Sequence, residues 1–393
     1  MTEILLGTFV FTALVMGLTL VVLGARAVVW GRGRARLTIN DEQVIESALG
    51  EKLLDALNSG GIHPPTSCGG LGTCGLCRVK VSGATPDEAE GYRPACQVVV
   101  RGDMHITVSP DLLRAKTWAC RVEQTRTLSP LIKEIVFALP AGESGAFAAG
   151  CYVLVNAPPF KLSFADIEIQ PELEATWQRM GLRSLKAENW FTQTRAYSLV
   201  NRPGEHGSLT LNVRLALPPG ASPDAPPGIV SSYLFGLNAG DPVEVSGPYG
   251  NFFVRDTDRE MILIGGGVGM APLYAHVYDQ LERLHTKRTI QYWYGARAVQ
   301  DLYYADEMEA LARTHDNFSW HPVLSNPTQD DAWAGETGFV HEAVYRQYLS
   351  THPSPQTCEY YLCGPPLMIQ AVRAMLDKLG VPEDNIFSDD FGV

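Results

Sequence analysis

Residues 68–77 read CGGLGTCGLC and set Cys68, Cys74 and Cys77 in one glycine-rich segment with the spacing C-x5-C-x2-C. Cys96 follows after 18 more residues, in the sequence RPACQ. Four thiolates are the ligands that a [2Fe–2S] cluster needs, and the intervening glycines let the backbone curl closely around it. A structural zinc site is the alternative, but zinc ribbons usually pair two CxxC knuckles and this chain has one. We expect the four cysteines to bind a [2Fe–2S] cluster.

The segments around these cysteines have the pattern of a small α+β domain. A hairpin, a short helix that ends at glycine and two later strands are expected, in that order, at residues 36–47, 51–61, 77–83 and 98–108. This is the β-grasp pattern of a ferredoxin, and we assign it to residues 36–115.

The N-terminus contains a long apolar run. Ile4 to Ala25 is 22 residues without a charge, and a helix of that length spans about 33 Å, enough for a bilayer core of about 30 Å. A cleaved signal peptide and a buried core helix are the alternatives, but the run is preceded by Glu3 without a Lys or Arg. Basic residues follow the run at Arg26, Arg32, Arg34 and Arg36. Because such residues stay on the cytoplasmic side, we expect one transmembrane helix and basic segment at residues 1–35, with all that follows in the cytoplasm.

Composition narrows the functional classes. The 393 residues suggest two to three domains, and 46% hydrophobic with 19% charged residues is typical of a globular chain. The net charge of -12 argues against a nucleic-acid partner, which requires a basic footprint. The isolated cysteines Cys120, Cys151 and Cys358 are interpreted as small buried hydrophobes.

The middle of the chain, residues 116–256, alternates short strands with Pro and Gly, which predicts an antiparallel β-barrel. Within it, RAYS at residues 195–198 offers an Arg for a phosphate, a Tyr for stacking on a flat ring and a Ser hydroxyl, although a barrel Tyr is more often simple packing. PGIVSSYL at residues 227–234 reads as a helix start, which favours an anion such as a pyrophosphate. Together the two motifs suggest a flavin dinucleotide.

The last third, residues 257–393, alternates strands and helices and predicts an α/β domain with a mostly parallel sheet. GGGVG at residues 265–269 allows the backbone to approach a dinucleotide closely, with a plain tight turn as the alternative. Cys363, in CGPP, stands at a strand end, where ligands of such sheets bind. It is placed to pack against a nicotinamide, or is a buried strand-end cysteine. Four acids follow the expected strand TIQYWYG at residues 289–295, namely Asp301, Asp306, Glu307 and Glu309, against one Arg297. They favour NADH over NADPH.

The succession of these motifs, ending in DDFG, resembles the ferredoxin–NAD(P)H reductase superfamily. Within it, the chain is most similar to the F-subunit family of Na⁺-translocating NADH:quinone reductases. The resemblance covers nearly the whole chain, including the apolar N-terminus and an insertion at residues 161–194 that soluble oxygenase reductases generally lack. One difference is the stretch from Ser82 to Pro94, which is shorter than in that family by roughly a dozen residues.

The resemblance implies roles for individual residues. For FAD, the implied contacts are Arg195 to a phosphate, Tyr197 stacked on the isoalloxazine, Ser198 near flavin N5, and Gly228, Ser231 and Ser232 around the pyrophosphate. For NADH, they are Gly265, Gly266, Gly267 and Gly269 along its path and Cys363 near the reacting nicotinamide carbon. Phe391 would cover the other flavin face and move to admit the nicotinamide. Ser198, Cys363 and Phe391 are thus the expected catalytic residues.

The implied function follows from electron counting, since NADH yields two electrons at once and an iron–sulfur cluster accepts one, so a flavin must stand between them. The family oxidises NADH through FAD and the cluster and passes electrons to integral-membrane subunits of a quinone reductase complex coupled to Na⁺ translocation. Its expected location is the bacterial inner membrane, single-pass, with the soluble domains facing the cytoplasm. A membrane-anchored NADH reductase that feeds an oxygenase or desaturase is the alternative, favoured by the short loop. A structural or assembly component with vestigial sites is a third.

Overall fold

The fold is described from a computed structural model. The residues that it describes are 8–9, 11–19, 21, 24, 33–66, 70–72, 75–83, 91–109, 112–113, 115–145, 147–202, 204–218, 225–250 and 252–390. The chain divides into two compact units, Met1–Arg114 and Ala115–Val393, and each is considered by itself. Among the described residues, no helix combines the length and the apolar character required to cross a membrane.

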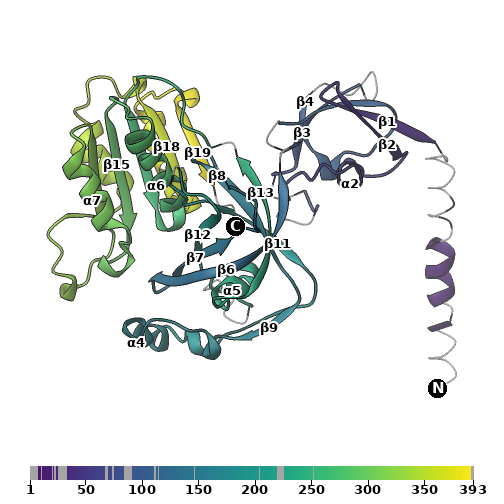
Figure 1. The fold of residues 1–393 in the computed structure, drawn as a ribbon, viewed down its shortest axis with the longest axis horizontal. Helices are drawn as coiled ribbons and strands as arrows, with labels where there is room; N and C mark the ends of the chain where they lie inside the picture. Colours follow the sequence, from purple (N-terminus) through teal and green to yellow (C-terminus); the bar gives the residue numbers. More distant parts are fainter. Residues whose placement is uncertain are drawn as a thin grey trace. The chain divides into compact units, whose positions relative to one another are not determined.

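A five-stranded mixed sheet forms the centre of the first unit (Figure 1). In sheet order its strands are β2 (Gln43–Ala48), β1 (Arg34–Ile39), β5 (Met104–Thr107), β3 (Arg78–Ser82) and β4 (Gly91–Pro94). The expected hairpin is present, with Ile39 paired to Gln43 and left-handed φ values of 49° at Asn40 and 60° at Asp41, which such turns require. Helix α2 (Leu53–Ser59) buries four apolar side chains. The arrangement agrees with the predicted β-grasp pattern.

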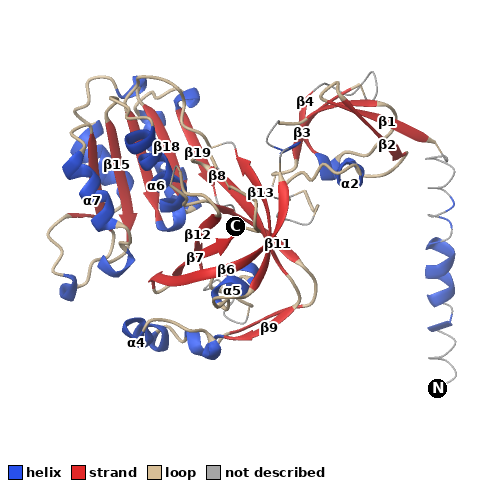
Figure 2. Ribbon diagram, viewed as in Figure 1, coloured by secondary structure: helices blue, strands red, loops and turns tan. Residues whose placement is uncertain are grey.

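The second unit begins with an antiparallel sheet that curls into a barrel (Figure 2). In sheet order its strands are β11 (Gln193–Ser198), β8 (Cys151–Ala157), β13 (Pro242–Gly250), β6 (Lys116–Ser129), β7 (Ile132–Ala138) and β12 (Ser208–Arg214). A β-bridge between Leu199 and Leu211 joins the two edges. Alternate strand residues point inward, so Phe137, Val153 and Leu209 form an apolar core with helix α5 (Ile229–Phe235).

The predicted insertion folds as a hairpin with a helix, comprising β9 (Phe160–Ser163), α4 (Pro171–Arg179) and β10 (Lys186–Asn189). Trp177 anchors this segment, because its ring is fully buried beside Phe235 and its Nε1 donates to the Pro130 carbonyl at 2.8 Å. The insertion is therefore part of the barrel core and not a detached loop.

A six-stranded sheet, parallel throughout, completes the second unit. In sheet order its strands are β17 (Glu336–Thr337), β16 (Phe318–Leu324), β15 (Ile290–Ala296), β14 (Met261–Gly266), β18 (Glu359–Gly364) and β19 (Ile386–Asp390). Alternate residues of β14 and β18 pack on opposite faces, one with helices α6 (Met270–Tyr278) and α7 (Ala305–Thr314), the other with α8 (Val340–Val344) and α9 (Pro366–Lys378). The predicted α/β fold is confirmed.

Specific contacts join the barrel to the parallel sheet within the second unit. Val200, just after β11, belongs to the same buried cluster as residues of α6 and α7. Arg202 Nη2 donates to Glu307 at 2.7 Å, and the Tyr304 hydroxyl donates to Glu134 and, at 3.1 Å, to Asn212. These contacts fix the position of the barrel against the parallel sheet.

Candidate cofactor sites

Two of the four predicted cluster ligands lie side by side in the first unit. Cys77 Sγ and Cys96 Sγ are 3.4 Å apart, and the two side chains are 1% and 2% exposed. The two sulfurs are not joined in a disulfide, which would bring them to about 2.05 Å. Two thiolates on one tetrahedral metal atom, at a metal–sulfur distance of about 2.3 Å, stand about 3.8 Å apart. The pair therefore fits a shared iron atom of a cluster.

Local backbone geometry produces this pairing. Cys77 immediately precedes β3 and Cys96 follows β4, and the Ala95 N–H donates to the Cys77 carbonyl at 2.8 Å. Gly70 and Gly72 both have φ of 82°, in the left-handed region that favours glycine. The other two predicted ligands, Cys68 and Cys74, lie outside the described residues. In the described part of the loop, only the pairing of Cys77 with Cys96 bears on the predicted cluster site.

The RAYS motif forms the end of barrel strand β11. Arg195 is exposed and donates through Nη1 to the Thr194 carbonyl at 2.8 Å. Tyr197 packs against the barrel core, and burial raises the pKa of its hydroxyl, so the ring stays neutral. Ser198 is buried, and its hydroxyl donates to Asp389 Oδ2 at 3.0 Å. Strand alternation sets Arg195 and Tyr197 on the same face of β11.

The predicted pyrophosphate site is the start of α5. Both serine hydroxyls donate to the Gly228 carbonyl, Ser231 at 3.0 Å and Ser232 at 2.7 Å. A Cβ on Gly228 would lie 2.7 Å from the Cβ of Ala216, so the turn has space for glycine alone. The serines therefore hold the helix start in place, while first-turn N–H groups are those that a helix offers to an anion.

The glycine turn after β14 is shaped by close backbone packing. A Cβ on Gly269 would lie 1.9 Å from the Cys363 carbonyl oxygen, and one on Gly266 would lie 2.8 Å from Met368 Sδ. Gly265 is similarly enclosed by Leu273. Gly267 differs, because it has φ of 55° and an added Cβ would meet open space. Of the four predicted glycines, three bring elements of the domain together and Gly267 faces the open side.

The residues predicted to meet flavin and nicotinamide come together at one end of the parallel sheet. We call the carboxyl ends of β14, β18 and β19 the carboxyl edge, where Gly265 pairs with Cys363 and Cys363 pairs with Asp389. Cys363 is fully buried there. Because the Ser198 hydroxyl binds Asp389, the barrel motif RAYS reaches the strand next to Cys363. Phe391, two residues beyond Asp389, lies outside the described residues.

Three contributors to this edge escaped the sequence analysis. Asp389 belongs to the quoted DDFG tail, but its contact with Ser198 spans 191 residues. Tyr294 and Tyr303 both donate to the Gly267 carbonyl, at 2.9 Å and 2.8 Å, and so hold the left-handed turn. The aromatic run YWYG at the end of β15 was the available signal for Tyr294.

Two of the four acids expected to select NADH already accept hydrogen bonds within the second unit. Glu307 accepts hydrogen bonds from Arg202 and Tyr274, and Asp301 accepts one from the Ala298 N–H at 3.3 Å. Burial raises the pKa of Asp301. These two acids serve local structure, so the number of acids in this segment is a weaker argument for NADH than the sequence alone suggests.

Comparison with known proteins identifies the family. Three family models match in succession, a 2Fe-2S iron-sulfur cluster binding domain at residues 37–101, an oxidoreductase FAD-binding domain at 184–254 and an oxidoreductase NAD-binding domain at 263–374. The F subunit of the Na(+)-translocating NADH-quinone reductase of Methylococcus capsulatus is 44% identical, with all of both chains covered. That of Marinomonas sp. is 42% identical, with 99% of each covered. The chain belongs to this F-subunit family.

Two solved structures are similar to this chain over most of its length. GcoB, a cytochrome P450 reductase from Amycolatopsis, has a TM-score of 0.63 and 25% identity and covers 91% of this chain and 98% of its own. The ferredoxin reductase in carbazole 1,9a-dioxygenase has a TM-score of 0.58 and 23% identity, covering 92% and 99%. The second is a likeness of fold alone.

Family membership confirms several predictions. The three domain matches agree with FAD, a [2Fe–2S] cluster and NADH as cofactors and with an oxidoreductase. The F subunit is one part of a larger complex, so partner subunits are implied. The contacts of single residues with these cofactors remain predictions.

Proposed function

We propose that this chain is the electron-input subunit of a Na⁺-translocating NADH:quinone reductase. It oxidises NADH at the carboxyl edge and delivers single electrons, through the ferredoxin-like domain, to the membrane part of the complex. The observation that carries the proposal is full-length identity of 42–44% to F-subunit relatives, with the three domains in the same chain. A bound flavin supplies the step from hydride acceptance to single-electron donation.

The residues proposed for each cofactor follow from their positions. Cys68, Cys74, Cys77 and Cys96 would hold the cluster. Arg195, Tyr197 and Ser198, with the backbone at Gly228, Ser231 and Ser232, would hold FAD. The turn Gly265–Gly269 would admit NADH towards Cys363, and Phe391 would close the other flavin face. The protein's own part is to bind, orient and exclude water. The Ser198–Asp389 contact supports this assignment, because Asp389 pairs with Cys363, the residue proposed to lie near the nicotinamide.

The membrane arrangement is part of the proposal. Residues 1–35 would anchor the chain as one helix in the bacterial inner membrane, residues 36–115 would form the ferredoxin-like domain, 116–256 the FAD domain and 257–393 the NADH domain, all facing the cytoplasm. The uncharged run Ile4–Ala25, the four arginines after it and the exposed side chains of Phe9, Phe11 and Leu14 support an anchor. The partners would be integral-membrane subunits.

A cysteine variant tests the proposed electron path. We expect Cys77→Ala to abolish electron transfer to the membrane acceptor yet to leave reduction of bound flavin by NADH within about twofold, because the two redox sites are separate. Cys120→Ala, which removes a buried thiol of the barrel, is the control and should keep both activities. Stopped-flow flavin absorbance and quinone reduction by the native complex are the two measurements. Equal loss of both steps in Cys77→Ala would refute the order.

Co-purification tests the partner. Recovery of the tagged chain from native membranes with several multi-span subunits and Na⁺-stimulated NADH oxidation is expected. Recovery with an oxygenase or desaturase component instead would favour the alternative of a membrane-anchored oxygenase reductase.

A further inference from the structure

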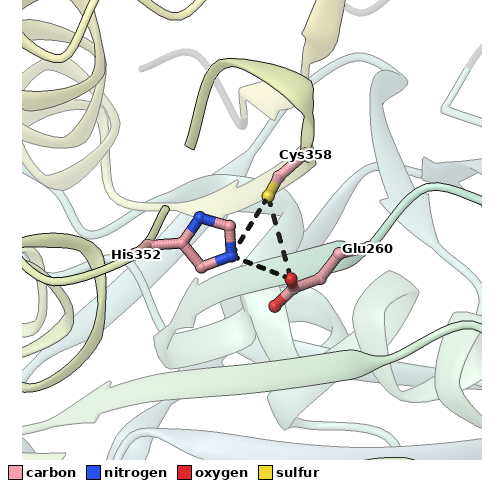
Figure 3. Close-up of side chains that lie close together, drawn as sticks. All are labelled: Glu260, His352 and Cys358. Atoms are coloured by element: carbon pink, nitrogen blue, oxygen red, sulfur yellow. Dashed lines mark hydrogen bonds and ion pairs between the residues drawn. The ribbon is translucent and has the colours of Figure 1, made fainter. Parts of the chain in front are cut away.

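Three donor side chains of different chemistry meet at the opposite end of the parallel sheet. We call the amino ends of β14 and β18 the amino edge. Glu260 immediately precedes β14 and Cys358 immediately precedes β18, and the Glu359 N–H donates to the Glu260 carbonyl at 2.9 Å. His352 enters from the loop that follows residues 345–349. Figure 3 shows the three side chains pointing toward one another.

The donor atoms form a compact triangle. His352 Nε2 lies 3.0 Å from Glu260 Oε2, Cys358 Sγ lies 3.9 Å from the same oxygen, and Sγ lies 3.8 Å from Nε2. Cys358 is 1% exposed, while the His352 and Glu260 side chains are 12% and 19% exposed. The triangle is thus shielded on the protein side and reachable from solvent through its histidine and glutamate.

These separations are close to those around a tetrahedral zinc ion. Bonds of about 2.3 Å to sulfur, 2.0–2.1 Å to imidazole nitrogen and 2.0–2.2 Å to carboxylate oxygen imply donor separations of about 3.4–3.6 Å. Each observed distance therefore needs to change by no more than about 0.5 Å. A thiolate, an imidazole and a carboxylate are also the three ligand types that zinc uses in proteins.

Neighbouring groups hold the donors in position. The Tyr348 hydroxyl donates to Glu260 Oε1, the oxygen that faces away from His352, and the Tyr360 hydroxyl donates to the Pro355 carbonyl at 2.9 Å. The loop that carries His352 and Cys358 contains two prolines, which limit its motion. Such outer contacts are those that orient metal ligands.

We propose that Glu260, His352 and Cys358 form a zinc site, separate from the redox centres, with water in the fourth position. Three protein ligands and one open position are a common zinc arrangement. By joining Glu260 at the start of β14 to the loop before β18, the ion would tie together two neighbouring strands of the nucleotide domain. Its effect would be on stability, because the carboxyl edge lies at the other end of the same strands.

The metal must replace protons. The Ser354 N–H donates to His352 Nδ1 at 3.2 Å, so in the metal-free chain Nε2 carries the ring proton and donates to Glu260. Zinc binding at Nε2 moves this single ring proton to Nδ1, and the 3.2 Å contact in which the Ser354 N–H donates to Nδ1 opens. The Cys358 thiol also releases a proton on binding.

A nucleophilic Cys–His pair is a poorer account of the same residues. The same ring nitrogen, Nε2, faces both Cys358 and Glu260, whereas an acid that orients a catalytic histidine binds the other nitrogen. Burial, with Glu260 adding to it, raises the pKa of the Cys358 thiol to about 12, so a metal-free thiolate is disfavoured.

Zinc and iron counting on the full-length holoprotein tests the site. After dialysis against micromolar ZnCl₂, we expect one zinc per chain in wild type, less than one tenth of that in Cys358→Ser, and unchanged zinc in the control Cys120→Ser, which alters another buried thiol. Equal iron and flavin contents in all three proteins establish that cluster loss has not created a zinc site elsewhere. Glu260→Gln should weaken binding at least tenfold. Equal zinc in wild type and Cys358→Ser would overturn the proposal.

A second measurement covers the case in which Cys358→Ser folds poorly. Cobalt(II), added to wild-type holoprotein as the probe, should give a thiolate-to-cobalt band in the difference spectrum that His352→Gln abolishes. Zinc at about a hundredfold excess over its Kd should raise the wild-type Tm by about 5–10 °C and leave that of His352→Gln unchanged. A band or a Tm shift that survives in His352→Gln would contradict the site.

Discussion

The two ends of the β14–β18 strand pair differ in the groups that they present. At the carboxyl edge the chain has glycines, which carry no side chain. The backbone of Gly269 packs against the Cys363 carbonyl, and Gly267 faces open space. At the amino edge three polar side chains lie close together, with Glu260 and Cys358 directed toward His352. Parallel strands place corresponding residues at the same edge, so one sheet can offer backbone to an organic cofactor at one end and donor atoms at the other.

A buried ion pair extends the polar character of the amino edge. Arg288 Nη2 donates to Glu359 Oε2 at 2.7 Å, and both side chains are nearly inaccessible, at 2% and 3% exposure. The remaining carboxylate positions accept from Thr257 at 2.8 Å and Tyr361 at 2.9 Å. The amino edge therefore depends on charge compensation and the carboxyl edge on close packing, and substitutions should separate the two.

The largest effect is expected at the ion pair. Arg288→Met leaves the Glu359 carboxylate buried without its cation, which costs about 3–5 kcal/mol. Denaturant unfolding of the second unit measures the loss. Arg346→Met removes an exposed partner of Glu336 and should cost less than about 1 kcal/mol. Similar losses of unfolding free energy in Arg288→Met and Arg346→Met would contradict the expected difference between a buried and an exposed ion pair.

Acid should weaken the second unit through a buried histidine of helix α6. His276 in α6 is fully buried, and desolvation, opposed in part by Asp279, lowers the pKa of its ring from 6.5 to about 4. Between these values the unfolded chain binds more protons, so the unfolding free energy falls as pH drops from 6.5 to 4, by up to about 3 kcal/mol. His276→Leu should flatten this dependence in urea unfolding at several pH values. An unchanged slope in the variant would show that other groups cause it.

Close packing at the carboxyl edge gives the next effect. Gly269→Ala forces the new Cβ against the Cys363 carbonyl, 1.9 Å away before relaxation, at a cost of about 1–3 kcal/mol. Flavin reduction by NADH should slow at least tenfold, since the turn and Cys363 move together. Gly91→Ala, where a Cβ meets nothing within 4 Å, is the control for unfolding and stopped-flow rates. Wild-type behaviour of Gly269→Ala would show that the turn is loosely packed.

The smallest effect is expected at the contact between barrel and sheet. Ser198→Ala removes one hydrogen bond to Asp389, worth about 1 kcal/mol, and should slow flavin reduction about fivefold at unchanged flavin content. Ser184→Ala, which removes an exposed hydroxyl of the insertion bound to Gly181, should leave the rate unchanged. A normal rate in Ser198→Ala would mean that the contact does not position the flavin motif.

Local patterns predicted what depends on neighbours in sequence. The hairpin expected at residues 36–47 is present, with its turn at Asn40 and Asp41. The parallel strands expected within residues 257–393 include the buried runs MILIGG and EYYLCG. The spacing of Cys68, Cys74, Cys77 and Cys96 indicated a cluster site, and a cluster-binding family model matches residues 37–101.

Contacts that depend on strand order could not be predicted. Cys358 was interpreted as a small buried hydrophobe, and it is buried, but 98 residues separate it from Glu260. The two meet because β18 lies next to β14, with β15, β16 and β17 on the other side. The link from Ser198 to Asp389 has the same origin. A sequence lists these residues without stating which strands are neighbours.

The hairpin of β3 and β4 has a consequence for how the chain tolerates length changes. Arg78 pairs with Pro94 and Val81 with Gly91, so hydrogen bonds close to Cys77 and Cys96 hold the two sulfurs together independently of the connection beyond them. The ladder pairs next to the two cysteines do not involve the residues at the far end of the hairpin. The length of this connection can thus change while Cys77 and Cys96 stay side by side.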